Sequence, residues 1–191
     1  MSCLGVHIAL NAEQEQDVWT HFYDETILDL AGALRADHDE EHRQRTDKAW
    51  DPIHRCLSDG TLVWDAGRWP LRGAILGSES LYFGGDYVVM LLERREVVEV
   101  AGALDAVTQE WFRDRLLALP GRGYEGAVDQ DAFDYTWYWF ERMRAFFRKT
   151  ADEGRDALHR GPVTPSYRRI DELSRCALLD TGRPRRAALG R

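Results

Sequence analysis

The segment DKAWDPIH, residues 47–54, is the most distinctive stretch of this chain, and the expected fold can be worked out from it. If these residues form a helix, Asp47, Asp51 and His54 fall on one face at positions i, i+4 and i+7. An apolar stripe lies beside that face and consists of Trp50, Ile53 and Leu57. The pattern predicts a helix that is anchored in a core and presents two carboxylates and an imidazole side by side.

Pro52 leaves the start of this helix open between two positions. A start at Thr46 or Asp47 puts the proline inside the helix and keeps the acidic face aligned, although the ring then removes one backbone hydrogen bond. A start at Pro52 suits the fixed φ of proline and makes Asp51 mainly an N-terminal cap. The chemistry available to the two carboxylates depends on which start the chain adopts.

Length and composition indicate one domain followed by a tail. The chain has 191 residues, 44% of them hydrophobic, which is enough for a core of its own. It has no run of the roughly 18 apolar residues that a membrane helix needs, and its start lacks the basic and apolar segments of an export signal. Three widely spaced cysteines fit a reducing compartment. We therefore expect a soluble, cytoplasmic protein.

The net charge of −8 is unevenly distributed along the chain. Residues 160–191 carry eight arginines against three acidic side chains, a net charge of +5, which leaves −13 on the remainder. An acidic body repels nucleic acids and membrane surfaces, so nucleic acid is expected only as a ligand of the basic tail, and no membrane partner is expected. We predict a domain over residues 1–160 and a flexible basic tail over residues 161–191.

Hydrophobic periodicity and capping residues predict the other elements. In chain order they are a half-buried strand at 6–10, helices from Ala12 to Trp19 and over 23–34, a polar connector at 37–42, loops over 61–81, a buried strand at 87–92, helices around 97–104 and 108–119, a long aromatic helix from 129 or 130 to 152, and a short strand within 155–159. The fold class expected is α+β, a mostly helical single domain with a small sheet.

Two short motifs imitate cofactor sites in the wrong context. HDEEH at residues 38–42 spells a zinc-peptidase string, but its flanks are charged and offer no apolar face for the helix that such a site requires. GRGYEG at residues 121–126 spells a dinucleotide-binding string, but it follows a helix and a proline, not a strand. We predict no metal site and no cofactor.

Several segments are distinctive when they are taken together: residues 5–10 (GVHIAL), 47–51 (DKAWD), 53–54 with Leu57, 70–71, 74–77 (AILG), 133–137 (FDYTW) and Gly154. Over roughly residues 4 to 160 the chain thereby resembles the YfbM-like family, a bacterial domain of unknown function. The resemblance implies a compact α+β domain and no particular reaction. Pro52 and the arginine-rich tail depart from the family pattern.

The leading functional hypothesis is a non-enzymatic binding protein for a protein partner or a small ligand. It rests on the surplus of aromatic residues and on the lack of a complete catalytic motif. The candidate contact residues are Lys48, Trp50, Tyr135 and Trp139. The alternative is a small hydrolase or other acid/base enzyme that uses Asp47, Asp51 and His54. A third possibility is a homodimer whose interface is an aromatic surface.

Overall fold

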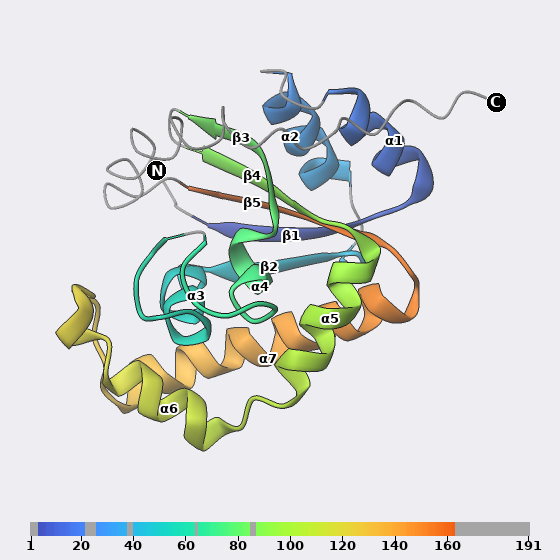
Figure 1. The fold of residues 1–191 in the computed structure, drawn as a ribbon. Coiled ribbons are helices and arrows are strands. Elements are labelled where there is room, and N and C mark those ends of the chain that lie inside the picture. The colour runs from blue at the N-terminus through green and yellow to red at the C-terminus, as the bar shows by residue number, and fades with distance from the viewer. Residues whose placement is uncertain (1–3, 22–25, 38–39, 64, 85–86, 163–191) are drawn as a thin grey trace.

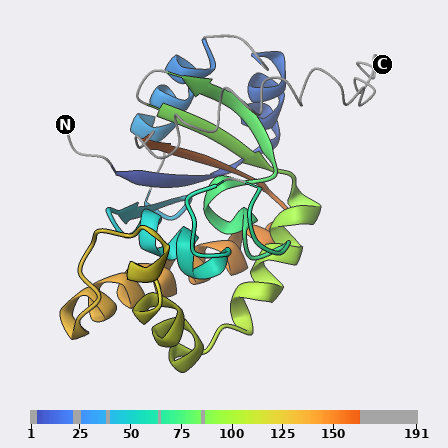
Figure 2. The ribbon, with the colours of Figure 1, turned by 60° about the vertical axis from the view of Figure 1, so that its left-hand side comes forward.

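The computed structural model describes residues 4–21, 26–37, 40–63, 65–84 and 87–162. They form three layers, with one sheet between two groups of helices (Figure 1). Figure 2 shows the same arrangement after rotation, with the long helix and its neighbours on the face of the sheet opposite to the first two helices. The prediction of an α+β domain with a small sheet is confirmed.

The sheet has five antiparallel strands in the spatial order β2-β1-β5-β4-β3. The strands are β1 (Gly5–Leu10), β2 (Arg43–Asp47), β3 (Glu79–Gly84), β4 (Tyr87–Leu92) and β5 (Asp156–Pro162). The last of the described strands along the chain, β5, is therefore the central one, and β2 and β3 form the two edges.

The helices divide between the two faces of the sheet. Helices α1 (Ala12–Thr20) and α2 (Ile27–Asp37) cover one face. The other face is covered by α3 (Trp50–Leu57), α4 (Gly73–Leu76), α5 (Arg94–Asp105), α6 (Gln109–Leu117), the 3₁₀ turn η1 (Pro120–Arg122) and α7 (Gln130–Asp152). Predicted caps are present: Asn11 and Gln14 form a capping box on α1, and Thr108 caps α6.

Because the sheet is covered on both sides, its inner strands β1, β4 and β5 are buried on both faces and the protein has two cores. Val6, Ile8 and Leu10 of β1 contribute to the core beneath α1 and α2, whereas Ala9 contributes to the larger core beneath α3 to α7. All six residues of β1 are buried, so the prediction of a half-buried strand at 6–10 is wrong. The alternation of side chains there sorts residues between two cores, not between core and solvent.

The segment 43–54 differs most from expectation. Arg43–Asp47 forms β2, an edge strand that the sequence analysis did not predict, and α3 begins at Trp50. Neither of the two predicted helix starts is correct. Asp47 has φ of 48°, which ends the strand and turns the chain towards the helix. Pro52 is the third residue of α3, where the backbone N–H has no partner within the helix anyway, so the proline removes no hydrogen bond.

Other differences concern element boundaries. The helix predicted over 23–34 is described over Ile27–Asp37, and the strand predicted within 155–159 spans Asp156–Pro162. His38 and Asp39 of the zinc-peptidase string and residues 163–191 of the predicted tail lie outside the described residues. Among the described residues, no helix has both the length and the apolar character required of a membrane span.

Candidate functional site

The three side chains expected to form an acid/base site lie in three separate hydrogen-bonded environments. Asp47 Oδ2 accepts from the Tyr135 hydroxyl at 2.8 Å. Asp51 Oδ1 accepts from Arg55 Nε at 2.5 Å, one helical turn further along α3. His54 Nε2 lies 3.2 Å from the carbonyl oxygen of Val63. These contacts use each group for a structural purpose, and none of them joins His54 to either carboxylate.

His54 is held as a neutral imidazole. Burial lowers its pKa to about 4, opposed by its hydrogen bond to Val63. Since a carbonyl oxygen can only accept, the ring nitrogen Nε2 carries the proton and donates it. Burial also raises the pKa of Asp51, while the charge and hydrogen bond of Arg55 act in the opposite direction. In this closed environment His54 is not exposed to a substrate.

Two further buried histidines lie side by side on the face of the sheet that α3 to α7 cover. His7 on β1 and His159 on β5 are register partners, with ring centroids 4.5 Å apart. His7 Nε2 donates to the Ala74 carbonyl oxygen at 2.9 Å. Burial lowers the pKa of His7 to about 4 and that of His159 well below its ordinary value. Both rings are therefore neutral core residues near neutral pH.

The histidine pair was missed by sequence reasoning because its members are far apart in the chain. His7 lies on the short strand β1 and His159 on the short strand β5. Only the register between these two strands brings the rings together. Within the described ranges, no group of three or more His, Cys, Asp or Glu side chains is placed to hold a metal ion.

A different set of residues forms an exposed aromatic surface on α7, made of Tyr135, Tyr138 and Trp139. Tyr135 is 40% exposed and Tyr138 is 52% exposed, while Trp139 is partly buried. The Trp139 ring meets both tyrosines edge to face, at centroid distances of 6.5 Å to Tyr135 and 5.2 Å to Tyr138. The spacing of three and four residues places all three on one side of the helix.

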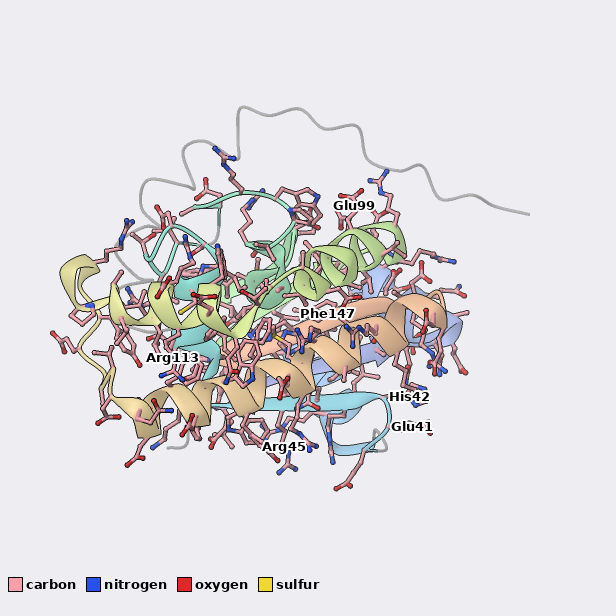
Figure 3. All side chains as sticks on the ribbon, turned by 90° about the horizontal axis from the view of Figure 1, so that it is seen from below. Glu41, His42, Arg45, Glu99, Arg113 and Phe147 are labelled. Carbon is pink, nitrogen blue, oxygen red and sulfur yellow. The ribbon has the colours of Figure 1, made fainter. Side chains whose placement is uncertain are left out.

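Tyr135 attaches this aromatic surface to the turn between β2 and α3. Its hydroxyl donates to Asp47 and accepts from the backbone N–H of Lys48 at 3.3 Å. Burial and the adjacent Asp47 carboxylate raise the pKa of Tyr135 to about 12, so the phenol remains protonated and can donate. Figure 3 shows α7 running alongside β2, with Arg45 on the strand side and the end of the helix near His42.

The remaining contact candidates divide between surface and core. Lys48 is exposed beside Tyr135. Trp50 is only 3% exposed and packs in the larger core with Ile53 and Leu57, so it supports the turn from inside and is not part of the exposed surface. Tyr138 was not among the residues selected from the sequence, because the stripe of α7 that faces solvent depends on which neighbours cover the helix.

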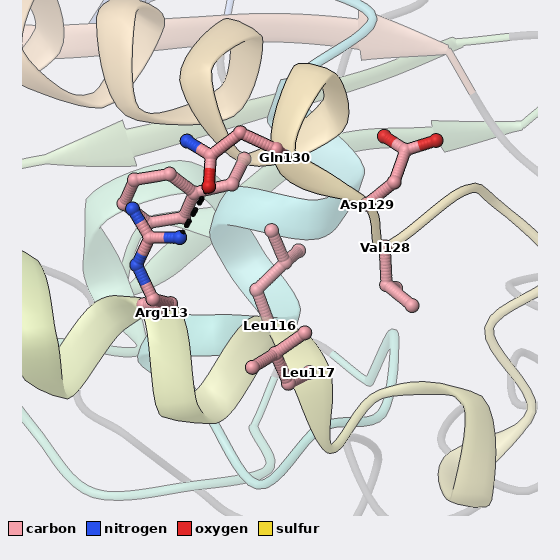
Figure 4. Close-up of a pocket in the computed structure, with 7 residues that line it drawn as sticks. Arg113, Leu116, Leu117, Val128, Asp129 and Gln130 are labelled. Carbon is pink, nitrogen blue, oxygen red and sulfur yellow. Dashed lines mark hydrogen bonds between the residues drawn. The ribbon is translucent and has the colours of Figure 1, made fainter.

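A shallow hollow lies between α6 and the start of α7 (Figure 4). Its volume is about 190 Å³, and it is lined by Arg113, Leu116, Leu117, Val128, Asp129, Gln130 and Phe133. Arg113 crosses it, donating to Gln130 Oε1 at 2.7 Å and lying 3.8 Å from the Phe133 ring centroid. The hollow is smaller than the ~300–1,000 Å³ of typical small-molecule pockets.

Comparisons with known proteins give a fold and a family, and the proteins that match are of unknown function. No curated protein matches the chain. Among solved structures, the chain is similar to the crystal structure of a protein of unknown function, YfbM from Escherichia coli, with 20% identity, a TM-score of 0.65, and coverage of 84% of this chain and 99% of that one. At this identity the likeness shows the fold alone.

The family comparison covers most of the chain. The model of the family described as Domain of unknown function (DUF1877) matches residues 1–159, from before β1 to within the central strand β5. That range contains every helix of the described structure and the exposed aromatic surface. The chain is thus a member of the DUF1877 family with a YfbM-like fold.

Proposed function

We propose that this chain is a non-enzymatic protein that binds a protein partner through the aromatic surface of Tyr135, Tyr138 and Trp139. The observation that carries the proposal is the exposure of two neighbouring tyrosines on a helix whose other face is buried among phenylalanines. Tyrosine and tryptophan dominate the energetics of protein interfaces, where each well-buried anchor contributes roughly 2 kcal/mol or more. Lys48 lies at the rim, where a charged residue serves orientation more than affinity.

Size favours a protein over a small ligand. The hollow between α6 and α7 measures about 190 Å³ and is crossed by Arg113. The aromatic surface, in contrast, is convex helix surface that offers rigid side chains with few rotatable bonds, which suits a macromolecular interface.

The separate environments of Asp47, Asp51 and His54 support a non-enzymatic role. A general base must reach the proton that it removes, and a triad requires hydrogen bonds between its members. Here Asp47 accepts a hydrogen bond from Tyr135, Asp51 accepts one from Arg55, and His54 donates one to a backbone carbonyl. The reducing cytoplasm of a bacterial cell is the setting that we propose, and it is compatible with Cys56, a buried free thiol whose pKa burial raises to about 12.

The test compares two substitutions that each introduce a glutamate at similarly exposed positions. Tyr138→Glu places a charge in the aromatic surface, and Val98→Glu places one on α5, where Val98 is 54% exposed. Tagged full-length protein is used to capture proteins from the native cell, followed by binding measurements with the purified partner. We expect a partner that the wild type and Val98→Glu bind alike and that Tyr138→Glu binds at least tenfold more weakly.

The proposal fails if every protein captured by the wild type is captured equally by Tyr138→Glu while both variants melt at the wild-type temperature. Reduced capture by both variants alike would also contradict it, because the effect would then not belong to the aromatic surface.

A further inference from the structure

We propose that the partner supplies an extended segment of alternating acidic and apolar residues, which adds to the outer edge of β2 as a further antiparallel strand. This inference rests on the proposed function and specifies the class of partner. It starts from topology, because β2 pairs with β1 on one side and no described strand covers its other side. Such an edge is a template for strand addition.

The hydrogen bonding of β2 shows which backbone groups face outward. The His42 carbonyl oxygen accepts from the Ala9 N–H at 2.9 Å, so residues in phase with His42 direct their backbone groups to β1. By the alternation of an antiparallel ladder, Arg43 and Arg45 direct theirs away from the sheet. The Gln44 side-chain amide donates to the outward carbonyl of Arg45, so an incoming strand would share or displace this hydrogen bond when it pairs there.

The side chains along this edge are basic, although the protein as a whole carries a net charge of −8. Arg43 and Arg45 project from the same face of β2, and their cross-strand partners on β1 are Ile8 and Val6. Lys48 follows in the turn after the strand. In the described part of the chain, no carboxylate pairs with Arg45 or Lys48, whereas the nearby acids are engaged: Asp47 with Tyr135 and Glu41 with Lys149. An incoming strand therefore gains most from acidic residues on that face.

The same charges argue against a second copy of this chain as occupant. Two β2 strands pairing antiparallel about Gln44 would set Arg43 of each copy opposite Arg45 of the other, and like charges directly opposite are destabilising. Basic side chains at a sheet edge disfavour pairing with a strand of like charge and favour pairing with a strand of opposite charge.

The aromatic surface determines what the other face of the incoming strand requires. Tyr135 contacts Asp47 and Lys48 at the end of β2, so α7 lies along the face of the sheet opposite to the arginines. Because successive side chains of a strand point to opposite faces, acidic residues facing Arg43 and Arg45 would alternate with residues facing α7. Apolar side chains suit that second position, next to the aromatic surface.

The probe is a synthetic ten-residue peptide that alternates glutamate with valine, measured by fluorescence anisotropy against the full-length protein. We expect saturable binding that Arg45→Glu weakens at least tenfold. Arg95→Glu is the matched control, since Arg95 is an exposed arginine on α5 whose side chain is 74% exposed. It should leave the affinity within twofold of the wild type.

Backbone pairing is tested separately from charge. N-methylation of every second amide along one edge of the peptide should abolish binding when that edge faces β2, and the peptide methylated along the other edge should still bind.

The inference is overturned if a lysine–valine peptide binds as well, if neither methylated peptide loses affinity, or if sedimentation shows a dimer that Arg45→Glu dissociates. Loss of the native partner by Tyr138→Glu but not by Arg45→Glu would overturn strand addition and leave the proposed function standing.

Discussion

At the residue scale, Gly5 shows how tightly β1, β2 and β5 are joined around α3. A Cβ atom at this position would lie 2.6 Å from Thr46 Oγ1, 3.0 Å from Trp50 Cβ and 3.2 Å from His159 Cε1. Trp50 Cβ is fixed to its backbone, and Thr46 and His159 are buried, so an added methyl group would force this close packing to shift. The glycine therefore permits the close approach of the edge strand and the first turn of α3.

We predict that Gly5→Ala lowers the free energy of unfolding by about 1–3 kcal/mol, because the added methyl group overpacks this junction. Gly102→Ala is the control, since a Cβ there meets nothing within 4 Å and the position is exposed on α5. That substitution should raise the free energy of unfolding by roughly 0.5–1 kcal/mol, as alanine is the better helix former. Urea denaturation measures both. Equal effects of the two substitutions would show that the junction tolerates a methyl group.

At the element scale, α3 is closed at its C-terminus by an arginine from another helix. Arg115 on α6 donates through Nε to the Cys56 carbonyl and through Nη2 to the Ser58 carbonyl. The last carbonyls of a helix have no intrahelical partner and carry a partial negative charge, so a guanidinium there is stabilising. This contact fixes the short helix that follows the turn attached to Tyr135.

We predict that Arg115→Gln lowers the free energy of unfolding by about 1–3 kcal/mol, because two buried carbonyls lose a charged donor. Arg113→Gln on the same helix removes one hydrogen bond and one cation–π contact at the surface and should cost about 1 kcal/mol or less. Guanidinium denaturation of both variants decides between them. If Arg113→Gln proved the more destabilising change, the cap would not be the reason for the position of Arg115.

Elements with their own local signals could be predicted from the sequence, and those that depend on register could not. Helices α1, α6 and α7 have capping side chains at Asn11, Thr108 and Asp129 and follow helical periodicity. Strand β2 reads RQRTD, without apolar alternation, and forms because β1 supplies hydrogen bonds to it. Missing β2 led directly to the misplaced start of α3.

The candidate site, too, could be predicted from the sequence only where local signals were sufficient. Tyr135 and Trp139 could be selected because the long helix has more aromatic residues than one buried stripe holds. Their relation to Lys48 could not be deduced, since it depends on Asp47 ending β2 with a positive φ next to α7. The supposed acid/base face disappeared for the same reason, because Asp47 belongs to a strand and not to α3.

At the scale of the whole molecule, buried histidines make stability depend on pH. His7 and His54 have pKa values of about 4 in the folded protein, below the ordinary 6.5. Between these values the unfolded chain binds more protons, so stability falls as pH drops from 6.5 towards 4, by up to roughly 3 kcal/mol per histidine. Asp156 opposes this change, because burial raises its pKa to about 6 and its protonation favours the folded state. Burial also raises the pKa of Asp51, so two carboxylates oppose three histidines, and the net effect is a loss of stability on acidification.

We predict that the free energy of unfolding, measured by urea denaturation, falls by several kcal/mol between pH 7 and pH 4.5. His159→Met should reduce this dependence and raise stability at pH 7 by about 1–2 kcal/mol, since neither ring nitrogen of His159 has a hydrogen-bond partner among the described residues. A pH profile that is flat, or that His159→Met leaves unchanged, would contradict the assignment of these rings as neutral core residues.

The central position of β5 has a consequence for how the protein is made. β5 hydrogen-bonds to both β1 and β4, yet it is synthesised after the other four described strands. A nascent chain that has not reached Asp156 holds two apolar strands that lack the partner between them, and partly folded chains with unpaired strands are prone to aggregation. The sheet is therefore completed in one late, long-range step, and until then the growing polypeptide leaves an edge of β1 and an edge of β4 unpaired.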